Sequence, residues 1–201
     1  WPSAGESSGV ELTAALVDKL NGQGVEVSYQ PVRALVPGKG LLRVDTEQRA
    51  LRARRVIVAT GARLRPLGVP QEETLRGKGV SQCAHCDGYF FRGQDVVVVG
   101  GGDAALQEAL VLASGCRAVT IVARSRLRAK SGYVERAAGA TNIRFVWDSV
   151  VDAVLGDATV SGVRLRNVKS GAITELACAG VFPFIGVEPN SGFLPPSVRR
   201  D

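Results

Sequence analysis

In the first part of the chain, the pattern of hydrophobic and polar positions predicts one helix followed by short strands. A Ser and a Glu three residues later predict a capped helix over 8–22, with leucines and alanines at helical spacing. Residues 25–30 then predict a strand, and 32–59 predict a small antiparallel meander of short strands. The last run, 56–59, is continuously apolar and predicts a buried strand.

The second region alternates strands and helices. A linker over 63–70, rich in Pro and Gly, marks the domain boundary. Beyond it, the predicted elements are strand 95–99, helix 103–114, strand 118–122, helix 131–139, strand 143–146, a second meander over 150–178 and an apolar strand over 181–186. Such alternation is typical of a parallel sheet with crossover helices. We therefore expect an α/β fold with a doubly wound, Rossmann-like domain and a β-meander.

The net charge and the length of the apolar runs limit the kinds of partner that the chain is expected to have. The 201-residue chain has a net charge of +6, mostly from arginine. No aromatic residues are interleaved with the arginines for base stacking, which favours a solvated face and a small phosphate site over nucleic acid. No apolar run is long enough to cross a bilayer, and the first residues do not resemble a signal peptide. The absence of Met predicts an excerpted or processed chain, or a Met-poor source.

A glycine-rich turn follows the strand 95–99. Gly100, Gly102 and Ala105 match G-x-G-x-x-G/A at a predicted helix start, a pattern that holds a dinucleotide pyrophosphate. After the next strand, Arg124 and Arg128 stand where an NAD site usually has an acidic residue. Arginine there favours a 2′-phosphate, and hence NADP over NAD. A turn that binds nothing and an exposed basic loop are the alternatives.

Two cysteines are spaced for redox chemistry. Cys83 and Cys86 form a C-x-x-C pair, and there is no second pair to complete a zinc site. A dithiol in a reducing compartment is the favoured interpretation. Asp87 either exchanges protons with a thiolate or forms a turn before Gly88. Cys116 and Cys178 are expected to be small buried hydrophobic residues.

The segment Cys83-Ala84-His85-Cys86-Asp87-Gly88 and the following turn closely resemble bacterial low-molecular-weight thioredoxin reductases. The flavoprotein subunit of alkyl hydroperoxide reductase is similar over the same region. Further matching segments are Trp1-Pro2, 58–62 and 182–190.

That resemblance implies FAD between NADPH and the disulfide, and a thioredoxin-like protein as electron acceptor. It implies that Cys86 faces the flavin, Cys83 attacks the partner disulfide and Asp87 acts as the acid. The residues matched to cofactor contacts are Gly100, Gly101, Gly102, Asp103 and Ala104 at the pyrophosphate, Arg124 and Arg128 at the 2′-phosphate, Ile185 and Gly186 near the cofactor, and Thr60, Gly61 and Ala62 beside FAD. We also expect the complete protein to be a cytoplasmic homodimer with no metal and no nucleic-acid or membrane partner.

The chain also departs from that family. Ala123 replaces a His and Ser125 replaces an Arg, which leaves NADPH against NADH open. Two FAD-binding segments of the family, one near each end, are not in the sequence. We therefore expect the core of a longer flavoenzyme, with a partial FAD-binding domain (1–66), an NADPH-binding domain (67–186) and a return segment (187–201). The core alone should hold FAD poorly. A peroxide-reducing flavoprotein and a non-catalytic NADP-binding or thiol-sensing module are the alternative functions.

Overall fold

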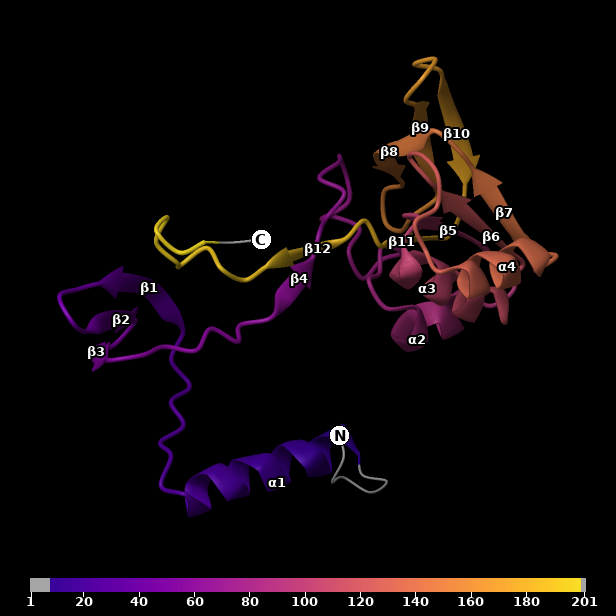
Figure 1. Cartoon of the computed structure of the whole chain (residues 1–201). Coiled ribbons are helices and arrows are strands. Elements are labelled where there is room, and N and C mark those ends of the chain that lie inside the picture. The colour runs from indigo at the N-terminus through magenta and orange to yellow at the C-terminus, as the bar shows by residue number, and fades with distance from the viewer. Residues whose placement is uncertain (1–7, 200–201) are drawn as a thin grey trace. The chain divides into compact units, whose positions relative to one another are not determined.

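The computed structural model describes residues 8–199, which form two compact units (Figure 1). One unit combines the chain up to Thr60 with residues from Ser191 onward, and the other is Gly61–Asn190. Trp1 and Pro2, part of the predicted resemblance, lie outside the described residues. Within 8–199, no helix is both long and apolar enough to span a membrane.

Among the described residues, the first unit contains one helix and one small sheet. Its elements are α1 (Gly9–Gly22), β1 (Val32–Pro37), β2 (Leu42–Thr46) and β3 (Ala50–Ala53). The Ser8 hydroxyl and the Glu11 carboxylate form the predicted capping box of α1. The three strands pair in the order β1-β2-β3, antiparallel throughout, which confirms the predicted meander.

Two predicted strands of this unit are absent. Residues 25–30 and 56–59 have no regular structure. Residues 56–59 are apolar and residues 25–30 alternate apolar with polar side chains, yet Val25 is 45% exposed and Ile57 is 92% exposed. An apolar strand is stable when neighbouring strands satisfy its backbone and cover its side chains. Among the described residues, no strand pairs with either segment, so their apolar pattern does not produce a sheet.

The second unit is built on a parallel sheet. Its elements are β4 (Ala62–Leu64), α2 (Ala84–Asp87), the 3₁₀ helix η1 (Gly88–Phe91), β5 (Asp95–Val99), α3 (Asp103–Ala113), β6 (Ala118–Val122), α4 (Ser131–Gly139), β7 (Ile143–Val146), β8 (Ser149–Leu155), β9 (Gly162–Asn167), β10 (Ile173–Ala177), β11 (Gly180–Pro183) and β12 (Val187–Pro189). The parallel sheet has the order β11-β5-β6-β7, while β8, β9 and β10 form an antiparallel meander. The predicted Rossmann-like fold class is confirmed.

The central strand β5 is buried on both faces, so its valines alternate between two cores. Val96 and Val98 pack with α2, α3 and α4, whereas Val97 and Val99 pack with the meander. Helices therefore cover one face of the parallel sheet and the meander covers the other (Figure 1). This arrangement holds the carboxyl end of β5, where the glycine-rich turn begins, on a rigid scaffold.

The predicted linker is partly ordered as strand. Residues 62–64 form β4, which pairs antiparallel with β12 to make a two-stranded ribbon. The Pro- and Gly-rich part, 65–70, has no helix or strand, as predicted. The buried Glu72 accepts the Leu67 N–H at 2.9 Å and the Gly68 N–H at 2.7 Å, which fixes this segment on the unit. Sequence patterns missed the ribbon because its two strands are short and far apart in the chain.

Candidate functional site

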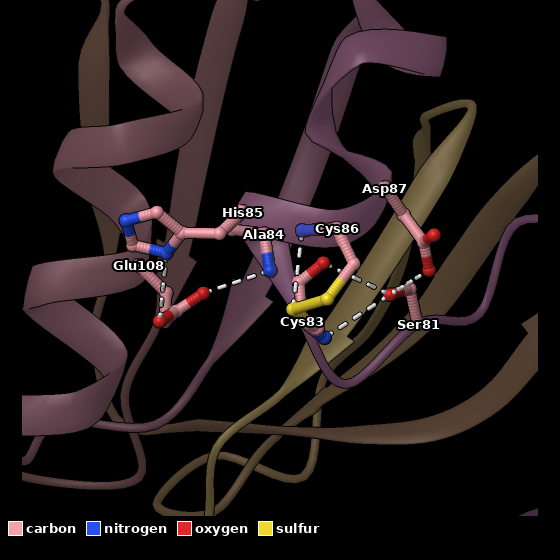
Figure 2. The surroundings of a disulfide bond; sticks show 7 residues. All are labelled: Ser81, Cys83, Ala84, His85, Cys86, Asp87 and Glu108. Atoms are coloured by element: carbon pink, nitrogen blue, oxygen red, sulfur yellow. Dashed lines mark hydrogen bonds and ion pairs between the residues drawn. A yellow bond between two sulfur atoms is a disulfide. The ribbon is translucent and has the colours of Figure 1, made fainter. Parts of the chain in front are cut away.

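The C-x-x-C segment begins a short helix. Cys83 is the residue before α2, and its sulfur is bonded to Cys86 Sγ at 2.07 Å, with the two Cα atoms 5.3 Å apart (Figure 2). The Cys86 N–H also donates to Cys83 Sγ at 3.1 Å. Cys83 is half-buried and Cys86 is exposed, so a reactant can reach the pair from solvent.

Ser81 connects Cys83 with Asp87. Its Oγ accepts the Cys83 N–H at 3.1 Å and donates to Asp87 Oδ2 at 2.6 Å (Figure 2). Ser81 is itself buried and fixed by its N–H, which donates to the Val181 carbonyl of β11 at 3.0 Å. The hydroxyl therefore holds the Asp87 carboxylate at one end of α2 in a defined position relative to the dithiol. Sequence reasoning missed Ser81.

A second carboxylate reaches α2 from α3. Glu108 Oε2 accepts the Ala84 N–H at 2.7 Å, and Glu108 Oε1 lies 3.5 Å from His85 Nδ1 (Figure 2). Glu108 satisfies a backbone donor that the first turn of a helix leaves without an intrahelical partner. Sequence reasoning missed Glu108 as well, since nothing local distinguishes it from a solvated helix residue.

The glycine-rich turn lines a cavity of about 610 Å³ at the carboxyl end of the parallel sheet. Gly100 adopts a φ of 141°, and a Cβ on it would lie 2.3 Å from the Phe184 carbonyl oxygen, so only glycine allows this approach of β5 and β11. Gly102 precedes α3 without a side-chain cap, and a Cβ on it would meet nothing within 4 Å. The space beside the start of α3 is therefore open.

Three arginines line the same cavity after β6. Arg124, Arg126 and Arg128 are exposed, and no ion pair involves them within the described part of the chain. The Arg128 N–H donates to the Gly101 carbonyl at 2.7 Å, which ties the arginine segment to the glycine turn. The Asp103 carboxylate, also in the lining, accepts the Lys130 N–H at 2.7 Å. The positive charges thus face the cavity unneutralised.

These features fit a phosphorylated dinucleotide. The open approach at Gly102 and the uncapped start of α3 suit a pyrophosphate, because backbone N–H groups there are available to an anion. The arginines suit a further phosphate, since guanidinium groups form paired charge-assisted bonds with it. Arg126 lies in the lining with the two predicted arginines.

The other predicted site residues fall in different places. Ile185 and Gly186 line the cavity, next to the turn residues. Gly61 accepts the Asn190 N–H at 2.9 Å, and Ala62 begins β4; neither belongs to the cavity lining. Thr60 ends the other unit. The structure thus brings the predicted NADPH residues together, whereas Gly61 and Ala62 lie outside the cavity lining and Thr60 belongs to the other unit.

The two remaining cysteines are free and buried, as predicted. Burial raises the pKa of the Cys178 thiol to about 12 and also raises the pKa of the Cys116 thiol. Both therefore stay protonated at neutral pH, which leaves the Cys83–Cys86 pair as the reactive sulfurs. The residues 8–199 contain no group of three metal-binding side chains.

The chain is similar in sequence to a known protein family and to several known proteins. The family model described as pyridine nucleotide-disulphide oxidoreductase matches residues 2–198. A thioredoxin reductase of Treponema pallidum is 41% identical over 189 residues, which cover 94% of this chain and 62% of that protein. A thioredoxin reductase of Streptomyces coelicolor is 48% identical over 148 residues, which cover 73% of this chain and 46% of that protein.

A solved structure is similar to this chain in its fold as well. The crystal structure of Lactococcus lactis thioredoxin reductase (FR conformation) aligns with a TM-score of 0.82 and 38% identity, covering 96% of this chain and 64% of that one. The predicted resemblance to thioredoxin reductases is therefore confirmed. The chain spans less than two thirds of the length of these relatives.

Proposed function

Since the chain belongs to the pyridine nucleotide-disulphide oxidoreductase family, we propose that its protein passes electrons from NADPH through FAD to the Cys83–Cys86 disulfide. From there they go to the disulfide of a thioredoxin-like protein. The observation that carries this proposal is the disulfide itself, formed in the same compact unit as the glycine-rich cavity. The thioredoxin reductases among its relatives support the choice of acceptor.

The residues assigned to NADPH are those of the cavity. Gly100, Gly101, Gly102, Asp103 and Ala104 would surround the pyrophosphate, Arg124 and Arg128 the 2′-phosphate, and Ile185 and Gly186 the adjoining part of the cofactor. Thr60, Gly61 and Ala62 would contact FAD. Once bound, FAD would accept a hydride from NADPH and deliver two electrons to the disulfide. The domain assignments 1–66, 67–186 and 187–201 belong to the same proposal.

The chain's own residues then carry out the thiol chemistry. Two electrons and two protons convert the Cys83–Cys86 disulfide to a dithiol. Asp87 takes the proton of the Cys83 thiol, and the resulting thiolate attacks one sulfur of the partner disulfide, forming a mixed disulfide. Asp87 then returns that proton to the departing partner thiolate. The Cys86 thiolate attacks Cys83 Sγ, which restores the intramolecular disulfide and releases the second partner thiol.

The proposed chemistry also suits a particular cellular compartment. A dithiol that must be kept reduced by NADPH suits the cytoplasm. We place the complete protein there as a homodimer, which size-exclusion chromatography with light scattering would test.

The thiol step can be tested without FAD. The 201-residue chain is reduced with dithiothreitol, freed of reductant and mixed with oxidised thioredoxin. The wild type should release reduced thioredoxin. Cys86→Ser should accumulate a mixed disulfide through Cys83. Cys83→Ser should form no such adduct, because in the proposed mechanism Cys86 attacks Cys83 Sγ and not the partner disulfide. Cys116→Ser, which alters a buried cysteine, is the control and should match the wild type. If Cys86→Ser reduced thioredoxin as completely as the wild type, the dithiol mechanism would be wrong.

Nucleotide binding is tested separately by the fluorescence of Trp147. This residue is next to Asp148 and two positions before Ser149, which lines the cavity. Titration with NADPH should give a saturable change at lower concentration than titration with NADH, because only NADPH carries the 2′-phosphate. Equal affinities would contradict the assignment of Arg124 and Arg128.

A further inference from the structure

The start of α2 is held by a carboxylate from a different helix. Glu108 is bonded to the Ala84 N–H and lies beside His85, and its side chain is only 19% exposed (Figure 2). A carboxylate that is largely withdrawn from water and hydrogen-bonded to the backbone has a fixed position. Its negative charge therefore acts on its neighbours at a short, constant distance.

The neighbour that matters chemically is Cys83, the residue directly before Ala84. When the disulfide opens, negative charge develops on sulfur. The Cys86 N–H, 3.1 Å from Cys83 Sγ, favours that charge. Glu108 has the opposite effect, because it occupies the Ala84 N–H and places a like charge at the residue that directly follows Cys83.

We propose that Glu108 is a positioning residue that disfavours the Cys83 thiolate and thereby makes the reduced dithiol a stronger electron donor. This inference rests on the proposed function, in which the dithiol must reduce a partner disulfide. A pair whose thiolate is stabilised by its surroundings is an oxidant, since its reduced form is favoured. Glu108 shifts the balance the other way.

Two other charged groups belong to this environment. Asp87, held by Ser81 at the far end of α2, adds negative charge to that of Glu108. His85 offsets the Glu108 charge when its imidazole is protonated.

The test measures the Cys83 thiol directly. In a Cys86→Ser background, the rate of Cys83 alkylation by iodoacetamide is followed against pH, with peptide mass analysis to separate Cys83 from the buried cysteines. Adding Glu108→Gln keeps the side-chain length and an acceptor oxygen for the Ala84 N–H but removes the charge. The pKa of the Cys83 thiol should fall by about 0.5 to 1 unit.

Two matched variants define the outcome. Glu135→Gln removes the same charge from an exposed position on α4 and should leave the titration unchanged. His85→Lys, at an exposed position, places a permanent positive charge beside Glu108 and should lower the thiol pKa even if Glu108→Gln does not fold. An unchanged or raised pKa in folded Glu108→Gln, or no decrease in His85→Lys, would overturn the inference.

A second measurement uses the intact pair. In the exchange of the disulfide with two glutathione molecules to give the dithiol and glutathione disulfide, Glu108→Gln should raise the equilibrium constant by about 3- to 10-fold at pH values above the thiol pKa. An unchanged constant would overturn the inference. Neither measurement needs NADPH, FAD or thioredoxin. If the expected shifts appear but reduced wild type does not reduce thioredoxin, the proposed function fails and the role of Glu108 in tuning the thiol stands.

Discussion

The glycines at positions 100 and 102 of the glycine-rich turn differ in backbone conformation and in the space around them. Gly100 has a backbone conformation that L side chains rarely adopt, and the Phe184 carbonyl leaves no room for a Cβ. Gly102 has ordinary extended φ and ψ angles and open space in front of it. The first glycine is therefore needed for folding, whereas the second leaves room for a ligand.

This difference predicts opposite results for two alanine substitutions. Gly100→Ala should destabilise the fold by about 2 kcal/mol or more, because it adds strain and a clash. Gly102→Ala should fold with nearly unchanged stability but bind NADPH more weakly, because its methyl group enters the space assigned to the pyrophosphate. Urea denaturation and Trp147 fluorescence titration measure the two effects. Tight NADPH binding by Gly102→Ala would contradict the proposed position of the nucleotide.

Residue-level prediction from the sequence was limited to local patterns. Cys83 with Cys86, and Gly100 with Gly102, are spaced along the chain as their chemistry requires, so a short segment is enough to identify them. Ser81 and Glu108 act through contacts formed by folding. Glu108 is 24 residues from the N–H that it binds, and an isolated carboxylate on a helix carries no sign of such a partner.

At the scale of elements, burial decided which predictions held. The strands 95–99, 118–122 and 143–146 were predicted at their observed bounds because the apolar side chains of each pack into the cores of the unit Gly61–Asn190. The segments 25–30 and 56–59 were also predicted as strands from their apolar positions, but no described strand pairs with either of them. α2 was missed because its four residues are too few to show a helical period.

An ion pair joins the starts of two of these strands. Asp95 begins β5, and Arg117 directly precedes β6; the guanidinium donates to both carboxylate oxygens at 2.8 and 2.7 Å. The hydrogen bond from Arg117 is the main cause of a lowered pKa at Asp95. Arg117→Gln should therefore reduce stability at neutral pH, but only slightly, because solvent screens an exposed pair.

The pH dependence of that effect has a definite sign. The folded-state pKa of Asp95 lies below its ordinary value of 3.8, so the pair stabilises the fold at any pH above that value. The contribution is lost as the pH falls through the folded-state pKa. Urea denaturation should show a constant difference between wild type and Arg117→Gln from neutral pH to about pH 4, and a vanishing one below it. Arg144→Gln, which affects Asp95 only through its charge, should have a smaller effect. A difference that grew towards low pH would contradict this assignment.

For the whole molecule, the core lies in one of the two units. Every buried hydrophobic side chain among the described residues belongs to Gly61–Asn190, with the single exception of Leu35. α1 has no buried residue. The unit Gly61–Asn190 is also closed on itself, because β4 pairs with β12 and the Asn190 N–H donates to the Gly61 carbonyl. Burial of apolar surface is the main source of stability, so this unit should account for most of it.

We therefore expect residues 61–190 to fold when expressed alone. This shortened chain contains the cavity, the disulfide and Trp147, so its NADPH titration and its cooperative urea transition should match those of the 201-residue chain. In the longer chain, a protease should cut first within 24–31 or 54–60, where the backbone has no helix or strand, and NADPH should protect only the 61–190 product. Flavin content supplies the complementary measurement: the isolated unit should bind none, and the 201-residue chain should bind well below one equivalent. An unfolded 61–190 product would show that the small unit contributes stability that its exposed side chains do not indicate.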